Sequence, residues 1–265
     1  MSLGSQIKDK ISNKFLFRKS KSDRFIELDV LRGLAIIYMI SFHFLWDLDY
    51  YGVRSLNAQM WQFKEIGAPV FLILVGICLV VSKNKNSIKP SSEQKKYNQH
   101  LILRGLNIFG LGMIITIATM IFIPNRPVLF GVLHCIGLSI ILCIPFLRFK
   151  SYNILFAILL ILTGFLLGQY TIENPTVFHL ALGLHQANIW SYTIDYFPLF
   201  PWFGVTLLGI ALGDILYKDN KRRFIFPDLS KYKPVYMFSW MGQHSLTIYL
   251  LHQPLIAGVL FIFVR

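Results

Sequence analysis

One apolar stretch near the start of the chain contains side chains that could do acid–base chemistry. The stretch is LDVLRGLAIIYMISFHFLWDLDYYG, residues 28–52, and its ionisable residues are Asp29, Arg32, His43, Asp47 and Asp49. In an α-helix, with about 100° between successive residues, Arg32 and His43 lie within about 20° of each other around the axis. Asp29 and Asp47, eighteen residues apart, lie at the same angle around the helix axis. The spacing predicts a polar stripe of Asp29, Arg32, His43 and Asp47, in which His43 lies about 16 Å along the axis from Arg32.

Two interpretations of the polar stripe are open. A charge buried in a membrane costs several kcal/mol unless it is paired or hydrated, so such residues tend to face a pathway or one another. In the first interpretation the stripe satisfies itself, through Asp29 with Arg32 and His43 with Asp47. In the second, which we favour, the stripe lines a route between the two sides of the membrane. Asp47 then holds His43 in one tautomer and raises its basicity, as in acid–base catalysis.

The composition places these residues in an all-α integral membrane protein. The chain has 265 residues, of which 55% are hydrophobic and 15% aromatic, and its mean hydropathy is +0.56. About 20 apolar residues are needed to cross the hydrocarbon core. The segments that meet this are 29–50, 66–82, 103–123, 128–148, 153–172, 198–217 and 235–263. We therefore expect a bundle of about seven transmembrane helices over residues 29–265, preceded by a basic cytoplasmic tail, residues 1–28. The last segment is long enough to break near Gly242.

The charge pattern gives the orientation of the bundle. The net charge is +13, and the basic residues gather before residue 29 and in the connections 83–104, 148–150 and 218–233. By the positive-inside rule the N-terminus is cytoplasmic and the C-terminus outside. The basic charge then contacts anionic membrane lipids rather than nucleic acid. The three cysteines fall inside apolar segments without metal-ligand spacing, so we expect them to be inert packing residues, with no metal site.

Other polar residues are candidates for a site that meets the polar stripe. His252 and Tyr249 fall inside about a 60° arc of the last span, and His252 is either a catalytic group or a hydrogen-bonded core residue. Arg104 and Asn107 open the third span on the cytoplasmic side, where they could bind the phosphates of a nucleotide or interact with lipid headgroups.

Two candidates lie toward the outer side. His134, in FGVLHCIG, is either an acceptor-binding residue or a satisfied core histidine. Trp202 follows an outer loop that is rich in aromatic and acidic residues and free of lysine and arginine. These residues suit a carbohydrate, but they also suit an interfacial aromatic belt.

The sequence also resembles a known family. The run ELDVLRGLAIIYMISFHF is similar to the first-helix signature of the transmembrane acyltransferases, and Arg32 and His43 match the Arg-x10-His motif of the acyltransferase-three family. With APVFLILVGICL, FGVLHCIGLSIIL, YFPLFPWFGVTLLGIALG and GQHSLTIYLLHQPL, the chain most resembles prokaryotic relatives of the heparan-α-glucosaminide N-acetyltransferase catalytic domain. His252 matches a histidine of that enzyme's last conserved span. The chain departs from the heparan enzyme at His43, where the resemblance places asparagine, so glucosamine specificity is not implied.

The resemblance implies a membrane acyltransferase, located in the plasma membrane, that uses cytoplasmic acetyl-CoA and acylates a hydroxyl or amine of a sugar outside. Arg32, Asp29, Arg104 and Asn107 would then hold the donor, and His43 would act as a base or as a transient acyl carrier. A proton-coupled transporter or lipid-linked-sugar flippase is the main alternative. A haem protein with two histidine ligands is a weaker one, because the chain has no CxxCH motif. The acceptor, the acyl chain and the oligomeric state, monomer or homodimer, are left open.

Overall fold

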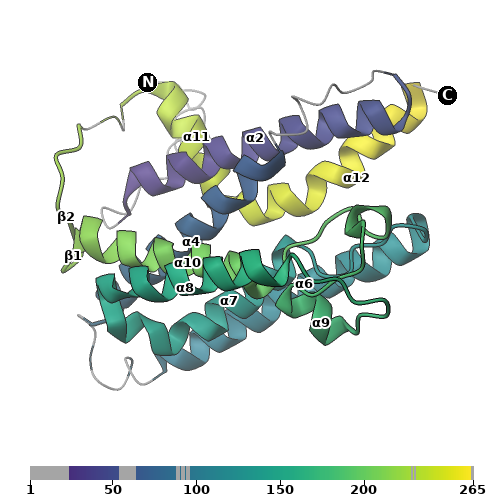
Figure 1. The fold of residues 1–265 in the computed structure, drawn as a ribbon. Helices are drawn as coiled ribbons and strands as arrows, with labels where there is room; N and C mark the ends of the chain where they lie inside the picture. The colour runs from purple at the N-terminus through teal and green to yellow at the C-terminus, as the bar shows by residue number, and fades with distance from the viewer. Residues whose placement is uncertain are drawn as a thin grey trace, which may run out of the picture.

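The computed structural model describes residues 24–53, 64–87, 90, 93, 96–227, 229 and 231–263, and in them the chain is mostly helical with almost no sheet (Figure 1). The longer helices are α2 (Ile26–Tyr50), α4 (Lys64–Ser87), α6 (Tyr97–Phe122), α7 (Val132–Phe146), α8 (Asn153–Leu167), α10 (Leu199–Leu216), α11 (Lys233–Gln243) and α12 (Ser245–Phe263). The short elements are η1 (Leu147–Tyr152), α9 (Val177–Leu182), η2 (Ile189–Ser191) and the strands β1 (Tyr217–Lys218) and β2 (Lys221–Arg222).

Six helical stretches of the described chain are long and apolar enough to cross a membrane. They are Ile26–Tyr50, Gly67–Ser87, Tyr97–Phe122, Val132–Leu167, Leu199–Leu216 and Ser245–Phe263. The fourth takes in α7, η1 and α8, but the backbone leaves the helical region at Lys150, where φ is 50° and ψ is −129°. The predicted fourth and fifth spans therefore form two helices of 15 residues each.

The helices pack in two connected groups (Figure 1). In one group α10 lies between α4 and α8, and α7 packs against α6; in the other, α2 lies beside α11 and α12. Contacts between α2 and α4 join the two groups. In Figure 1, α2 and α12 run in the same direction, and the β1–β2 hairpin lies at the end of the bundle where α2 begins.

The exposed faces of the bundle are apolar, as a membrane requires. On α6 and α8, large side chains such as Ile114, Ile117, Leu155 and Phe165 are more than half exposed. Contiguous apolar surface of this kind is rare on proteins that live in water. The buried core lies between α4, α7 and α10, where Leu79, Ile140, Leu207 and Ile210 are almost fully enclosed.

The predicted break in the last span is confirmed, two residues beyond Gly242. Helix α11 ends at Gln243 and α12 begins at Ser245, with His244 between them. The His244 ring lies on that of Trp240, with 4.5 Å between centroids, and its Nδ1 hydrogen-bonds to the Trp240 carbonyl oxygen at 2.8 Å. His244 thus packs against Trp240 and caps the end of α11 at the break.

Two glycines let α11 cross α2 at backbone contact. A methyl group at Gly33 would overlap the carbonyl oxygen of Phe238, and one at Gly242 would overlap that of Asp29. Such overlaps must be relieved by backbone shifts, because both neighbours are main-chain atoms. The crossing therefore depends on the absence of side chains at these positions, and it fixes where α12 starts relative to the polar stripe.

We expect Gly242→Ala to lower stability by about 1–3 kcal/mol because the added methyl separates α11 from α2. Thermal unfolding of the detergent-purified protein measures this as a lower midpoint. Gly258→Ala is the matched control on α12, since a Cβ there meets no atom within 4 Å. Equal midpoints for the two variants would contradict the close crossing.

Candidate active site

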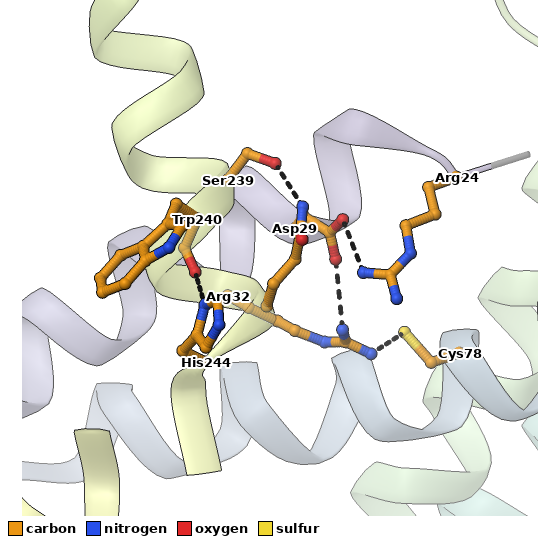
Figure 2. A network of polar contacts seen from close by, with 8 residues as sticks. Arg24, Asp29, Arg32, Cys78, Ser239, Trp240 and His244 are labelled. Atoms are coloured by element: carbon orange, nitrogen blue, oxygen red, sulfur yellow. Dashed lines mark hydrogen bonds and ion pairs between the residues drawn. The ribbon is translucent and has the colours of Figure 1, made fainter. Parts of the chain in front are cut away.

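The N-terminal end of the predicted stripe is an ion-pair network around Asp29 (Figure 2). Asp29 is buried, and its carboxylate lies 3.4 Å from Arg32 Nη1 and 3.9 Å from Arg24 Nη1. Arg32 also reaches across to α4, where its Nη2 donates to Cys78 Sγ at 2.8 Å. The expected pair of Asp29 with Arg32 is therefore present. The sequence predicted that Cys78 is an inert packing residue. In the structure its sulfur also accepts a hydrogen bond from the Arg32 guanidinium.

A second cation lies near this network. Arg104 of α6 is exposed and lies within electrostatic range of both Arg32 and Cys78. Two guanidinium groups on different helices thus approach the same region, as a binding site for phosphates would require. Asn107, one turn further along α6, is also exposed, and its binding role stays a prediction.

The other end of the stripe meets α12. The rings of His43 and His252 are in contact and tilted, with 4.9 Å between centroids and 59° between planes. The structure thus brings together the two histidines that the sequence placed about 200 residues apart. Asp47 is only 2% exposed and accepts hydrogen bonds from Gln253 Nε2, at 2.8 Å to Oδ1 and 3.0 Å to Oδ2. That Asp47 orients His43 stays a prediction.

Tyr249 contributes its backbone to the histidine pair. His252 Nδ1 lies 2.5 Å from the Tyr249 carbonyl oxygen, and the two rings are 5.6 Å apart. A carbonyl oxygen can only accept, so Nδ1 carries the proton and the neutral His252 ring has its lone pair on Nε2. The tautomer of His252 is therefore set by the helix that carries it.

His134 is held in a complete hydrogen-bond chain, which favours its structural interpretation. It is 1% exposed, and its Nδ1 accepts from the Gly131 N–H at 3.2 Å. Its Nε2 lies 3.5 Å from Thr116 Oγ1, whose hydroxyl donates to the Val128 carbonyl oxygen at 2.7 Å. One ring nitrogen accepts and the other donates, so the neutral ring is satisfied. His134 thereby caps the start of α7.

Trp202 lies in the first turns of α10 and packs against Phe197 of the preceding loop, with 5.1 Å between ring centroids. It is partly buried and packs against a buried cluster that includes Leu72, Phe130 and Tyr196. This position is compatible with an acceptor-binding wall, and that role stays a prediction. Among the described residues, no three His, Cys, Asp or Glu side chains come together in a way that could hold a metal ion.

Sequence reasoning missed two polar residues that form hydrogen bonds near the two ends of the stripe. Gln253 follows His252 directly, and the signal was an amide next to that histidine in the middle of a predicted span. Glu27 lies just before the stripe, is 7% exposed, and pairs with Arg222 of β2 at 2.6 Å. The hydrogen bonds from Arg222 to the Glu27 carboxylate raise the pKa of Arg222 above its usual value. The sequence signal for Glu27 was an acidic residue at the start of an apolar helix.

An apolar helical bundle with buried charges and facing histidines defines a multi-pass membrane protein with an internal polar site. Residues 24–254 match the family described as heparan-alpha-glucosaminide N-acetyltransferase, catalytic, and the chain belongs to this family. The match includes the whole polar stripe together with His252 and Gln253. Family membership indicates an acetyltransferase. No curated protein and no solved structure gives a significant match.

Proposed function

We propose that the chain transfers an acetyl group from cytoplasmic acetyl-CoA to a hydroxyl or amine of a sugar on the outer side of the plasma membrane. The observation that carries this proposal is the arrangement along α2. Cations gather around Arg32 at one end, and His43, which contacts His252, lies eleven residues further on, about 16 Å along the axis. Phosphates need cations, and acyl transfer needs a base or nucleophile, so one helix supplies both ends of the reaction path.

The proposed orientation has the N-terminus inside, the C-terminus outside and seven crossings, with α7 and α8 crossing separately. The helix break at Lys150 supports this count. Arg148 and Lys150 lie at that break, and the β1–β2 hairpin adds Lys218, Lys221 and Arg222 at the end of the bundle where α2 begins (Figure 1). Such basic connections are typical of the cytoplasmic side.

His43 takes part in the chemical step by one of two routes. In direct transfer it takes the proton of the acceptor hydroxyl or amine while the acceptor oxygen or nitrogen attacks the thioester carbonyl carbon. The carbon–sulfur bond then breaks, and the CoA thiolate takes up the proton. In the other route His43 attacks first, CoA leaves, and acetyl-histidine passes the group to the acceptor. Ping-pong kinetics and a trappable acetyl-histidine distinguish the second route from the first.

The test is acetyl-CoA binding to the detergent-purified protein, measured by calorimetry. We expect Arg32→Ala to weaken binding by about tenfold to a hundredfold, because charge-assisted hydrogen bonds to phosphate are lost. Arg32→Lys keeps a cation beside Asp29 and should retain part of the affinity. Arg148→Ala is the matched control, since Arg148 is an exposed cation away from the polar stripe. A folded wild type that binds no acetyl-CoA would refute the proposed donor and favour a transporter.

A further inference from the structure

Two neighbouring side chains of α12 bury hydrogen-bond acceptors that no described residue satisfies. They are Nε2 of His252 and Oε1 of Gln253. His252 is 8% exposed, and because its Nδ1–H donates to the Tyr249 carbonyl oxygen, Nε2 of the neutral ring has only a lone pair to offer. This nitrogen can be satisfied only by a group that donates a proton.

The orientation of the Gln253 amide is fixed by Asp47. The amide nitrogen must face the carboxylate, since it is the only part of the amide that can donate, and it lies 2.8 Å from Oδ1 and 3.0 Å from Oδ2. The amide oxygen is consequently turned away from Asp47. Oε1 of Gln253 and Nε2 of His252 are therefore both acceptors, carried by consecutive residues that reach toward α2.

The hydrogen-bonding groups at the His252 end of the stripe differ from those at the Arg32 end. Around Arg32 the guanidinium groups of Arg24 and Arg32 donate beside the Asp29 carboxylate, and such cationic donors suit phosphate oxygens. Around His252 they are two unsatisfied acceptors and the Asp47 carboxylate, which is 2% exposed. Buried acceptors without a partner are unfavourable, so a ligand that satisfies them gains hydrogen bonds. A thioester carbonyl, itself an acceptor, cannot satisfy them.

We infer that His252 Nε2, Gln253 Oε1 and the Asp47 carboxylate form the subsite for the acyl acceptor, and that they bind it through several N–H or O–H donors. A sugar amine with its neighbouring hydroxyl groups has this chemistry. The inference rests on the proposed function and adds to it the residues that recognise the acceptor. The 4.9 Å separation of the His43 and His252 rings places this subsite next to the proposed base.

The test compares the binding of two probes, D-glucosamine and acetyl-CoA, each measured by calorimetry on the full chain in detergent. His252→Phe and Gln253→Met keep the approximate size of each side chain and remove the acceptor atom. We expect each to weaken glucosamine binding by about tenfold or more while acetyl-CoA affinity stays within about twofold. His244→Phe is the matched control, a histidine of the α11–α12 junction that lies on Trp240, and should leave both affinities unchanged.

Each outcome decides the inference. Equal weakening for both probes, or no weakening of glucosamine binding, would overturn it, as would a wild type that does not bind glucosamine. A wild type that binds glucosamine but not acetyl-CoA, with the loss in both variants, would support the subsite and reject the proposed donor. If His252→Phe does not fold, Gln253→Met alone carries the test, because its side chain is less enclosed than that of His252.

Discussion

Replacing His43 with alanine is expected to lower the rate of acetyl transfer by about 10²- to 10⁴-fold, the usual contribution of a positioned base or nucleophile. Acetyl-CoA affinity should stay within about twofold, because the cations proposed to hold the donor lie about 16 Å away around Arg32. The measurement is CoA release with and without acceptor, alongside calorimetric binding of acetyl-CoA to the same preparation. A loss of rate with binding retained is the signature of a group that acts in the transition state.

His244→Ala is the control for loss of a histidine near the α2–α11–α12 region. Its ring lies on Trp240 and takes no part in the histidine pair, so we expect turnover close to that of the wild type. If His43→Ala retained full activity while His252→Ala lost it, the base would be His252 and the assignment to His43 would be wrong. If both lost activity with unchanged thermal midpoints, the two rings would act as one unit.

Helical periodicity was sufficient to predict the polar stripe, because the azimuth of each residue on α2 depends only on its place in the chain. The long last span and Gly242 likewise predicted the break before α12. The pairing of Asp47 with Gln253 could not be predicted in this way. It depends on the rotation and register of α12 against α2, which are set by the backbone contacts at Gly33 and Gly242.

The candidate site was predicted only in part for the same reason. The sequence predicted that the polar face with His252 meets the stripe, but the direct contact of His43 with His252 is a property of how two helices pack. For His134 the sequence left two roles open, and the Gly131 and Thr116 contacts favour the structural one. The pairing of Glu27 with Arg222 joins residues 195 positions apart and has no local signature.

Arg222→Ala is expected to be strongly destabilising, by about 3 kcal/mol, because it leaves the Glu27 carboxylate buried without its cation. Arg222 binds both carboxylate oxygens, with Nε at 2.6 Å from Oε1 and Nη2 at 2.8 Å from Oε2. The guanidinium also lies over the Phe25 ring, 5.1 Å from its centroid. Thermal unfolding in detergent should show a midpoint lowered by several degrees.

The hairpin that carries Arg222 explains why this bridge matters to the site. Asp219 and Asn220 both have positive φ, 50° and 58°, as a tight two-residue hairpin turn requires. The turn pairs Tyr217 with Arg222 across the strands, and the Tyr217 hydroxyl donates to Glu27 Oε1 at 3.1 Å. Both strands therefore bind Glu27 in the first turn of α2, and Glu27 lies two residues before Asp29.

The loss of stability should be smaller for a substitution at Glu27 than for one at Arg222. Glu27→Gln keeps an acceptor for Tyr217 and leaves a cation whose side chain is 32% exposed and so remains partly hydrated. We expect it to cost about 1 kcal/mol, less than Arg222→Ala, and the double variant to cost less than the sum of the two. Arg223→Ala, which removes the neighbouring exposed cation, should change stability by less than about 0.5 kcal/mol. Equal losses at Arg222 and Arg223 would contradict the bridge, since they would show that only the surface charge of the hairpin counts.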